Sequence, residues 1–187
     1  MLNPYANYFV SPETTPLERR IARQSQAVQR ARELYRSARF AGQVSRLIAW
    51  LSRRPDHLLE APEVLPERVT ASHFSGLQPV PIGRIVASEG RSQDFDGAFN
   101  PLQEGNGERW TKIATLKLLG YDLPPVELIQ VGEAYIVRDG HHRISVAAAL
   151  GQESIDAHVT ELQGSPGWEA GKPISKLTLR AGAAVSN

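Results

Sequence analysis

The stretch Ala134–Gln152, AYIVRDGHHRISVAAALGQ, decides the fold of this chain. Its first six residues are rich in β-forming side chains, and Gly140 separates them from a run of small and apolar residues that Gly151 closes. The pattern predicts a strand over 134–139, a tight turn, and a helix that starts at His141. Such a turn leaves free backbone N–H groups and the positive end of a helix dipole where glycine permits close approach. We therefore predict a phosphate or carboxylate site at this turn.

The side chains around the turn supply further groups for such a site. Arg143 adds a cation whose planar fork suits phosphate oxygens, Ser145 adds a hydroxyl, and His141 is a candidate proton carrier. The predicted ligand-binding residues are Asp139, Gly140, His141, His142, Arg143, Ser145 and Arg91.

Two other interpretations of the turn remain open. Asp139 is a common type of helix cap, so the residues after it could simply be solvated. Zinc is the second alternative, with His158 as a further ligand, but adjacent histidines on a helix point about 100° apart and do not converge as an i, i+4 pair does.

Further elements on both sides of this stretch predict an α+β domain over residues 79–163. They are a strand at 80–88, a helix at about 108–119 closed by Gly120, a strand at 125–130 that forms a hairpin with 134–139, and a final strand at 154–162. Trp110 repeats with the apolar residues of its helix and is expected in the core, although stacking on a nucleotide is an alternative.

A loop over residues 89–107 has little periodicity, and loops of this length inside a compact domain are usually functional or mobile. Asp94 and Asp96 place two carboxylates at i, i+2, which suits Mg²⁺ held beside substrate phosphates. Glu89 is a candidate general base if the loop folds close to the turn. The alternative is that these aspartates make local turns in a solvated loop.

Five segments describe the domain organisation. They are an N-terminal arm at 1–15, an arginine-rich amphipathic helical extension at 16–55, a connector with one short helix at 56–78, the domain at 79–163 and a loosely held C-terminal tail at 164–187. Thr15-Pro16-Leu17-Glu18 is a capping signal that predicts the start of the extension. Gly42 is expected to bend or split it, because glycine costs about 1 kcal/mol inside a helix.

Charge is distributed very unevenly along the chain. Between Arg19 and Arg54 there are ten arginines and one acid, whereas 79–163 has seven basic and twelve acidic residues. The basic helix could dock on an acidic surface of its own domain or of a partner, a second copy included; it could bind DNA; or it could be a solvated face. The residues expected to make such contacts are Arg19, Arg20, Arg23, Arg30 and Arg32.

Composition excludes several classes of protein. The chain has 187 residues, 41% of them hydrophobic and none of them cysteine, so a disulfide scaffold, a thiolate metal site and a cysteine nucleophile are excluded. No window approaches the roughly 20 apolar residues of a membrane span, and the N-terminus lacks an export signal. We expect a cytoplasmic protein without membrane contact.

The segment from about Val80 to Leu162 resembles the ParB/sulfiredoxin-like superfamily, whose proteins are often labelled ParB-like nuclease domains. The shared signature is a strand, a glycine-containing turn that ends in arginine, and a helix of small residues closed by glycine. Where this chain has Gly140-His141-His142-Arg143, ParB proteins have Gly-Glu-Arg-Arg and sulfiredoxins have Gly-Cys-His-Arg. ADP-dependent free serine kinases have Asp-Gly-His-Thr-Arg, which is the nearest match. The stretches VPIGRIVASEGRSQDFDGAF, LPPVELIQVGEAYIVRDGHHRISVA and IDAHVTE also resemble a group of small bacterial stand-alone ParB-like proteins.

The resemblance implies a small mixed sheet with packed helices and a nucleotide at the turn. It favours a nucleotide-dependent phosphotransferase or hydrolase with Mg²⁺, using Arg143 on phosphate and His141 or Glu89 for proton transfer. A non-catalytic DNA-binding or partitioning-type module is the alternative, and a nuclease is a third. His141 stands where sulfiredoxins have their catalytic cysteine, which excludes sulfinic acid reduction by that route. The ParB glutamate, second arginine and helix-turn-helix are absent, so we do not expect a CTP-gated clamp.

Overall fold

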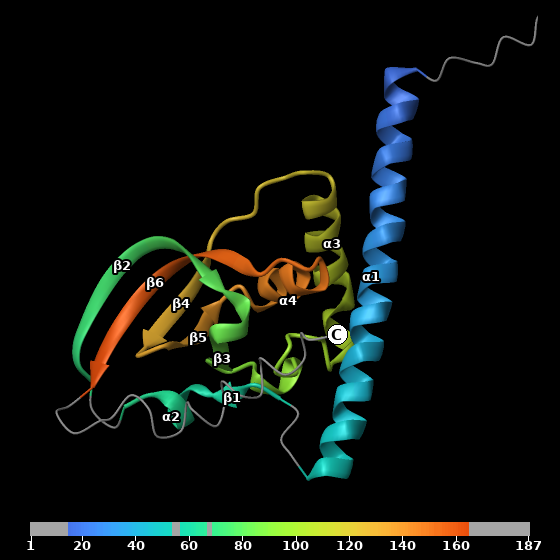
Figure 1. Cartoon of the computed structure of the whole chain (residues 1–187). Coiled ribbons are helices and arrows are strands. Elements are labelled where there is room, and N and C mark those ends of the chain that lie inside the picture. The colour runs from blue at the N-terminus through green and yellow to red at the C-terminus, as the bar shows by residue number, and fades with distance from the viewer. Residues whose placement is uncertain (1–14, 54–56, 67–68, 165–187) are drawn as a thin grey trace, which may run out of the picture.

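The computed structural model describes residues 15–53, 57–66 and 69–164, and it shows a mixed six-stranded sheet with helices against both faces (Figure 1). The helices and strands are α1 Pro16–Ser52, β1 Leu59–Glu60, α2 Ala61–Val64, β2 Val69–Pro81, β3 Ile85–Ser88, α3 Gly107–Leu118, β4 Val126–Val131, β5 Ala134–Asp139, α4 His141–Ala149 and β6 Ser154–Gly164. The predicted α+β fold, a small mixed sheet with packed helices and an N-terminal helical extension, is confirmed.

The strand order of the sheet is β1-β3-β5-β4-β6-β2. Strands β3 and β5 are parallel neighbours, and Ser88 at the end of β3 pairs in register with Val137. Parallel neighbours end at the same edge of a sheet. The end of β3 and the turn after β5 are therefore brought together at one edge, which is where the candidate site lies.

Alternating side chains of the central strands build a core on each face of the sheet. Val137 of β5 packs in one cluster with Ile144 and Ala147 of α4. Its neighbour Ile136 packs on the opposite face in a cluster with Val64 of α2. The position of α4 is thus fixed by the sheet beneath it, and with it the position of the turn that precedes it.

Helix α1 is one continuous helix of 37 residues. The capping box predicted at its start is confirmed, since the Thr15 amide donates to the Glu18 carboxylate at 2.7 Å and the Glu18 amide to the Thr15 hydroxyl at 3.2 Å. The predicted break at Gly42 is wrong. A Cβ at this position would lie 3.1 Å from the carbonyl oxygen of Pro101, so the glycine allows α1 to lie close against the domain.

The prediction that α1 is amphipathic is wrong as well. Its buried residues are all small, namely Ala27, Ala31, Ala38 and Gly42. Most of its large apolar side chains are exposed instead, Trp50 at 75% among them. Ala31 and Ala38 let α1 approach α3 closely (Figure 1), and the aromatic rings of Tyr35 and Trp110 pack with their centroids 5.4 Å apart.

The predicted connector at 56–78 is wrong in its second half. Residues from Val69 onward form β2, which pairs along its length with β6 as an antiparallel ribbon. Nearly all of β2 is exposed, so its sequence lacks the alternation of a half-buried strand. The short helix expected in this segment is confirmed as α2, and the strand predicted at 80–88 is interrupted by a 3₁₀ turn at Ile82–Arg84.

The remaining elements agree with the predicted pattern. The helix predicted at 108–119 is α3, the hairpin is β4 and β5 joined at Gly132, and the helix and final strand are α4 and β6. The predicted arm and tail lie outside the described residues, apart from Thr15 and Gly164. Within the described part of the chain, no helix has the length and apolar character needed to cross a membrane.

Candidate anion-binding site

The turn between β5 and α4 has the geometry that the sequence predicts. Gly140 has φ +102°, a left-handed conformation that side chains other than glycine rarely adopt. A Cβ at Gly140 would also lie 2.4 Å from Cγ1 of Val126, so glycine is needed both for the backbone angle and for space. The turn is therefore held tightly against β4.

No side chain caps the start of α4. Its N-cap residue is Gly140, which makes no side-chain capping bond. The Asp139 carboxylate instead forms a short hydrogen-bonded ion pair with Arg143, so the interpretation of Asp139 as a simple helix cap is wrong. The first N–H groups of α4 lack partners within the helix, as at any helix start, and they remain available to an anion.

Both histidines of the turn are buried against one aromatic ring. His141 stacks on Phe95 with ring centroids 6.2 Å apart, and His142 meets the same ring edge-on at 5.5 Å. Nε2 of His141 is hydrogen-bonded to Oγ of Ser88 at 2.7 Å. His142 is 5% exposed, and its Nε2 has no hydrogen-bond partner among the described residues. Buried polar atoms without a partner are uncommon, so this nitrogen points to a missing group.

The surroundings keep both imidazoles neutral at pH 7. Burial, with positive charge nearby, lowers the pKa of His141 to about 4 and that of His142 to about 4. After burial, Arg91 has the largest effect on the pKa of His141, and Arg109 has the largest on that of His142. A neutral imidazole has one N–H donor and one acceptor. His141 is consequently a weak base at neutral pH.

A small pocket of about 60 Å³ lies at this helix start. Its lining residues are Arg91, Arg109, Ile113, Asp139, Gly140, His141, His142 and Arg143. Three of these carry positive charge and one carries negative charge. The pocket brings together all the predicted ligand-binding residues except Ser145. It also includes Arg109 from α3, whose side chain makes no ion pair or hydrogen bond with another described residue.

Ser145 has a structural role. It is buried, and its Oγ accepts a hydrogen bond of 2.8 Å from Nε1 of Trp110. Ser145 does not line the pocket, and its hydroxyl lies in the α3–α4 interface, so the structure gives no support to its predicted role as a ligand group. Trp110 is fully buried, which confirms its place in the core and excludes it as an exposed stacking surface.

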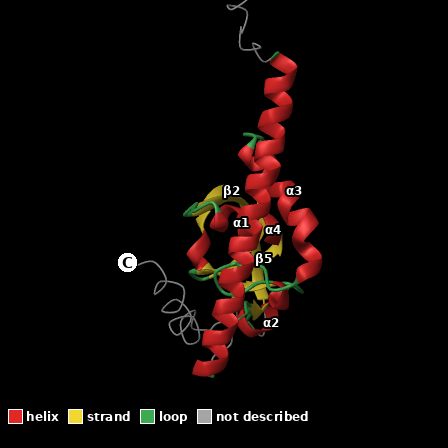
Figure 2. Cartoon of the chain, turned by 90° about the vertical axis from the view of Figure 1, so that its right-hand side faces the viewer, coloured by secondary structure: helices red, strands yellow, loops and turns green. Residues whose placement is uncertain are grey.

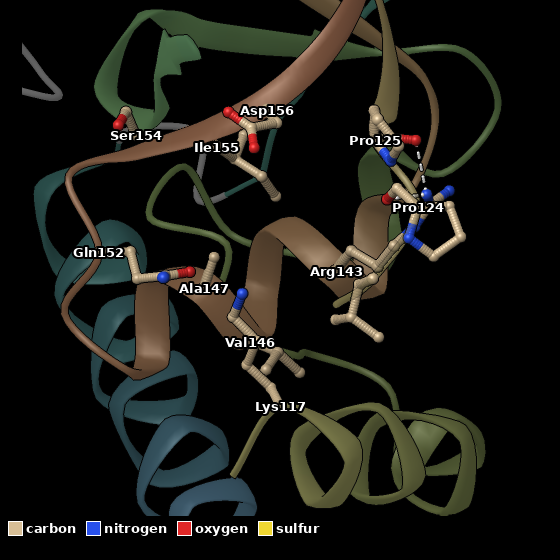
Figure 3. A pocket seen from close by; sticks show the side chains of 11 residues that line it. Lys117, Pro124, Pro125, Arg143, Val146, Ala147, Gln152, Ser154, Ile155 and Asp156 are labelled. Carbon is tan, nitrogen blue, oxygen red and sulfur yellow. Dashed lines mark hydrogen bonds between the residues drawn. The ribbon is translucent and has the colours of Figure 1, made fainter. Parts of the chain in front are cut away.

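Arg143 mainly holds the site together. Its Nη1 donates to the carbonyl oxygens of Pro124 and Pro125 at 2.6 and 2.7 Å, and its Nη2 to Asp139. Figure 3 shows this guanidinium directed at the two prolines, at the edge of a second hollow of about 250 Å³ on the other side of Arg143. The cation predicted to hold phosphate thus joins the end of β5 to the start of β4, and it also lines the smaller pocket.

The predicted pair of Mg²⁺ ligands does not form. Asp96 is buried, and its carboxylate oxygens accept hydrogen bonds from the Ala98 amide and from the amide and side chain of Asn100. Asp94 forms a 3.4 Å ion pair with Arg91. The alternative of local turn chemistry is correct for Asp96.

Other predicted metal and catalytic roles also find no geometric support. No group of three histidine, aspartate or glutamate side chains that could hold a metal ion occurs in residues 15–53, 57–66 and 69–164. Glu89 pairs with Arg138 at 3.2 Å and does not line the pocket. In its place, Ser88 is the β3 residue that touches the turn. Sequence reasoning missed it because only the pairing of β3 with β5 brings it there.

The predicted contact arginines of α1 lie apart from the pocket. Arg19, Arg20, Arg23, Arg30 and Arg32 are all exposed. Helix α1 lies on its own domain through its alanine face, and Arg39 forms an ion pair of 3.3 Å with Glu104 across this contact. Docking of the five predicted arginines on an acidic surface stays a prediction.

Comparison with known proteins gives one structural likeness. No family model matches the chain, and no curated protein matches it. The chain is similar to the crystal structure of sulfiredoxin from Arabidopsis thaliana, with 16% identity, a TM-score of 0.31, and coverage of 44% of this chain and 82% of that one.

Proposed function

We propose that the pocket at the start of α4 binds the phosphate of a nucleotide or of another small phosphorylated molecule. The observation that carries the proposal is the buried Nε2 of His142, which has no hydrogen-bond partner in the described part of the chain and lies at a helix start without a side-chain cap. A phosphate oxygen would accept a hydrogen bond from this nitrogen in its N–H form. It would also accept from the free N–H groups of α4 and meet the helix dipole favourably.

Charge and size both fit a single phosphate group. Arg91, Arg109 and Arg143 border the pocket, against Asp139 as the only acid. A volume of about 60 Å³ is well below the roughly 300 to 1,000 Å³ of pockets that enclose a whole ligand. A bound nucleotide would therefore bury one phosphate here and leave its nucleoside on the surface.

The proposal concerns binding of phosphate and does not require the pocket to catalyse a reaction. His141 is the predicted proton carrier among the residues that line the pocket, and with a pKa of about 4 it accepts protons weakly at pH 7. Mg²⁺ remains a prediction, with Asp94 as the candidate carboxylate, because it pairs with Arg91, which lines the pocket. Transfer or hydrolysis of a phosphoryl group would need the bound ligand itself to bring the metal.

The test is a panel of ADP, ATP, CTP and inorganic phosphate, each with and without Mg²⁺, scored by the melting temperature of the chain. A ligand that binds only the folded state raises this temperature by mass action. Arg109→Gln should weaken binding roughly tenfold or more, because a hydrogen bond to a charged group contributes about 1.5 to 3 kcal/mol. Arg84→Gln is the matched control, since Arg84 is exposed and lies outside the pocket. If no phosphate-bearing compound raises the melting temperature, the proposal is wrong.

DNA binding by α1 is a second candidate, favoured by the exposure of its arginines. Its first turns extend beyond the domain (Figure 1) and carry Arg19, Arg20 and Arg23 on the surface. Neutralising phosphates with such side chains gives affinity that falls with salt. Nothing in this candidate requires the pocket, so the two functions can be tested separately.

A further inference from the structure

The last turns of α1 carry an apolar surface that no described residue covers. It consists of Phe40, Val44, Leu47, Ile48 and Leu51, which we call the α1 stripe. Their exposed fractions range from 38% for Val44 to 67% for Phe40 and Leu51. Isolated apolar side chains on a surface are ordinary, but five large ones on contiguous turns mark an interaction site.

The α1 stripe faces away from the domain. At 3.6 residues per turn, its centre lies roughly opposite the buried face formed by Ala31, Ala38 and Gly42. Figure 2 looks onto this outer side, with α1 in front of the sheet and of the other helices. Helix α1 thus has two apolar faces: a face of small residues packs on α3, and a face of large residues is left open.

We propose that the α1 stripe pairs with the same stripe of a second copy of this chain, with the two helices antiparallel. The spacing of Phe40, Val44, Leu47 and Leu51 is four, three and four residues, the repeat that places side chains along the seam between two helices. It also reads the same in both directions, as a two-fold antiparallel contact requires. Phe40 then meets Leu51 of the second copy, and Val44 meets Leu47.

The charge distribution along α1 favours the antiparallel direction over the parallel one. In the antiparallel pair, position 36 lies beside position 55 of the second copy, so the arginines before Arg36 lie beyond the end of that helix at Ser52. Only Arg36 and Arg39 come near Arg53 and Arg54 of the second copy. A parallel pair would set each of these arginines beside its own copy, and like charges repel at such distances. Arg46 is the one charged residue within 40–52, and it lies roughly 140° around the helix from the stripe centre.

The available area is near the lower limit for a specific interface. Five side chains exposed to this degree offer roughly 500 Å² per chain, or about 1,000 Å² for a pair, where specific interfaces begin. A seam of this size predicts a reversible dimer that dissociates on dilution. Since the stripe and the α4 pocket are on different elements, dimerisation does not depend on the proposed ligand.

The first test measures the mass of the full chain by sedimentation over a wide range of concentrations. We expect a reversible monomer–dimer equilibrium. Leu47→Glu and Leu51→Glu should each make the chain monomeric at concentrations where the parent is a dimer, because the new charge would be buried in the seam. Ile21→Glu is the matched control, since Ile21 is 55% exposed on the same helix but outside the stripe. It should leave the dimer intact.

The second test uses the absence of cysteine from the chain to determine direction. In the antiparallel pair, Val44 faces Leu47 of the second copy. Mixing Val44→Cys with Leu47→Cys should therefore give a disulfide-linked heterodimer under oxidation, and neither variant alone should link efficiently. In a parallel pair each variant would link to itself.

Three outcomes would overturn the proposal. The parent chain could remain a monomer at every concentration, even if the stripe binds a vesicle or another segment of the same chain. The dimer could survive both glutamate substitutions, which would place the interface elsewhere. Leu47→Cys could link to itself while the mixture gives no heterodimer, which would contradict the antiparallel arrangement.

Discussion

Oγ of Ser88 lies 2.7 Å from Nε2 of His141 and joins the end of β3 to the first residue of α4. The same hydroxyl accepts a hydrogen bond of 3.1 Å from the Arg91 amide. One small side chain thus fixes the imidazole beside the pocket and the start of the loop that brings Arg91 to it. The loop 89–107 is held at its first turn by this contact.

Ser88→Ala should lower the stability of the fold. The substitution leaves Nε2 of the buried His141 and the Arg91 amide without their partner, and each unsatisfied buried group costs about 1 to 3 kcal/mol. Urea unfolding monitored by circular dichroism would measure the loss. Ser72→Ala on the exposed part of β2 is the control and should leave the free energy of unfolding unchanged. If the free energy of unfolding of Ser88→Ala equals that of the parent, water replaces the hydroxyl as the hydrogen-bond partner.

Gly140→Ala should be more damaging than alanine at another left-handed glycine. Gly140 and Gly120 both have positive φ, +102° and +87°, and the backbone strain of an alanine there is about 1 to 2 kcal/mol. Only at Gly140 does a Cβ also collide with Val126, whereas nothing lies within 4 Å at Gly120. The difference in unfolding free energy between the two variants isolates the collision. If both variants lose the same free energy of unfolding, then β4 shifts to accommodate the Cβ at position 140 at no measurable cost.

Stability should fall as the pH is lowered from about 6.5 toward 4. The pKa of His141 and of His142 is lowered to about 4 in the folded chain, from 6.5 for an unperturbed histidine. The unfolded chain therefore binds more protons in this window, and protonation favours unfolding. The contribution is complete above pH 6.5 and is lost as the pH falls through 4. Melting temperatures measured across this range would show the loss.

The pH effect should be smaller in the double variant His141→Gln, His142→Gln, which removes both groups. His73→Gln is the control, because His73 lies on the exposed surface of β2 and should leave the effect unchanged. Equal slopes of melting temperature against pH in the parent and the double variant would show that other groups are responsible.

Removing arginines from α1 tests the second candidate function. If α1 binds DNA, changing Arg19, Arg20, Arg23, Arg30 and Arg32 to serine should abolish binding at low salt and flatten the dependence of affinity on salt concentration. Fluorescence anisotropy with a labelled duplex would measure both quantities. The pocket variant Arg109→Gln should bind DNA as the parent does. Absence of DNA binding in the parent would remove this candidate.

Local signals in the sequence are sufficient for the strand, turn and helix around Gly140. The β-rich run, the glycine and the alanine-rich helix each have a short-range physical cause, so the position of the candidate site could be predicted. Strand β2 could not, because it is exposed along nearly its whole length and is held by backbone pairing with β6. No pattern of buried side chains marks it.

Roles that depend on tertiary contacts could be predicted only in part. Glycine usually destabilises a helix interior, which is why a break is predicted at Gly42. In the structure, Gly42 instead allows α1 to pack close to the carbonyl of Pro101. From the sequence alone, the carboxylate of Asp96 is a plausible metal ligand. The structure shows that it accepts hydrogen bonds from the amides of its own turn. Arg143 lines the pocket, but its bonds to Pro124 and Pro125 join segments that the sequence does not show to be neighbours.

The close packing of Gly140 against Val126 has a consequence for the rate of ligand binding. A turn packed tightly against β4 has little freedom to change its conformation. If the turn binds an anion as proposed, the binding site is already formed and little conformational entropy is lost on binding. Capture would then be governed by diffusion and by attraction toward the arginines around the mouth, with no slow rearrangement of the chain to wait for. The affinity of such a site would depend mainly on the rate at which the ligand dissociates.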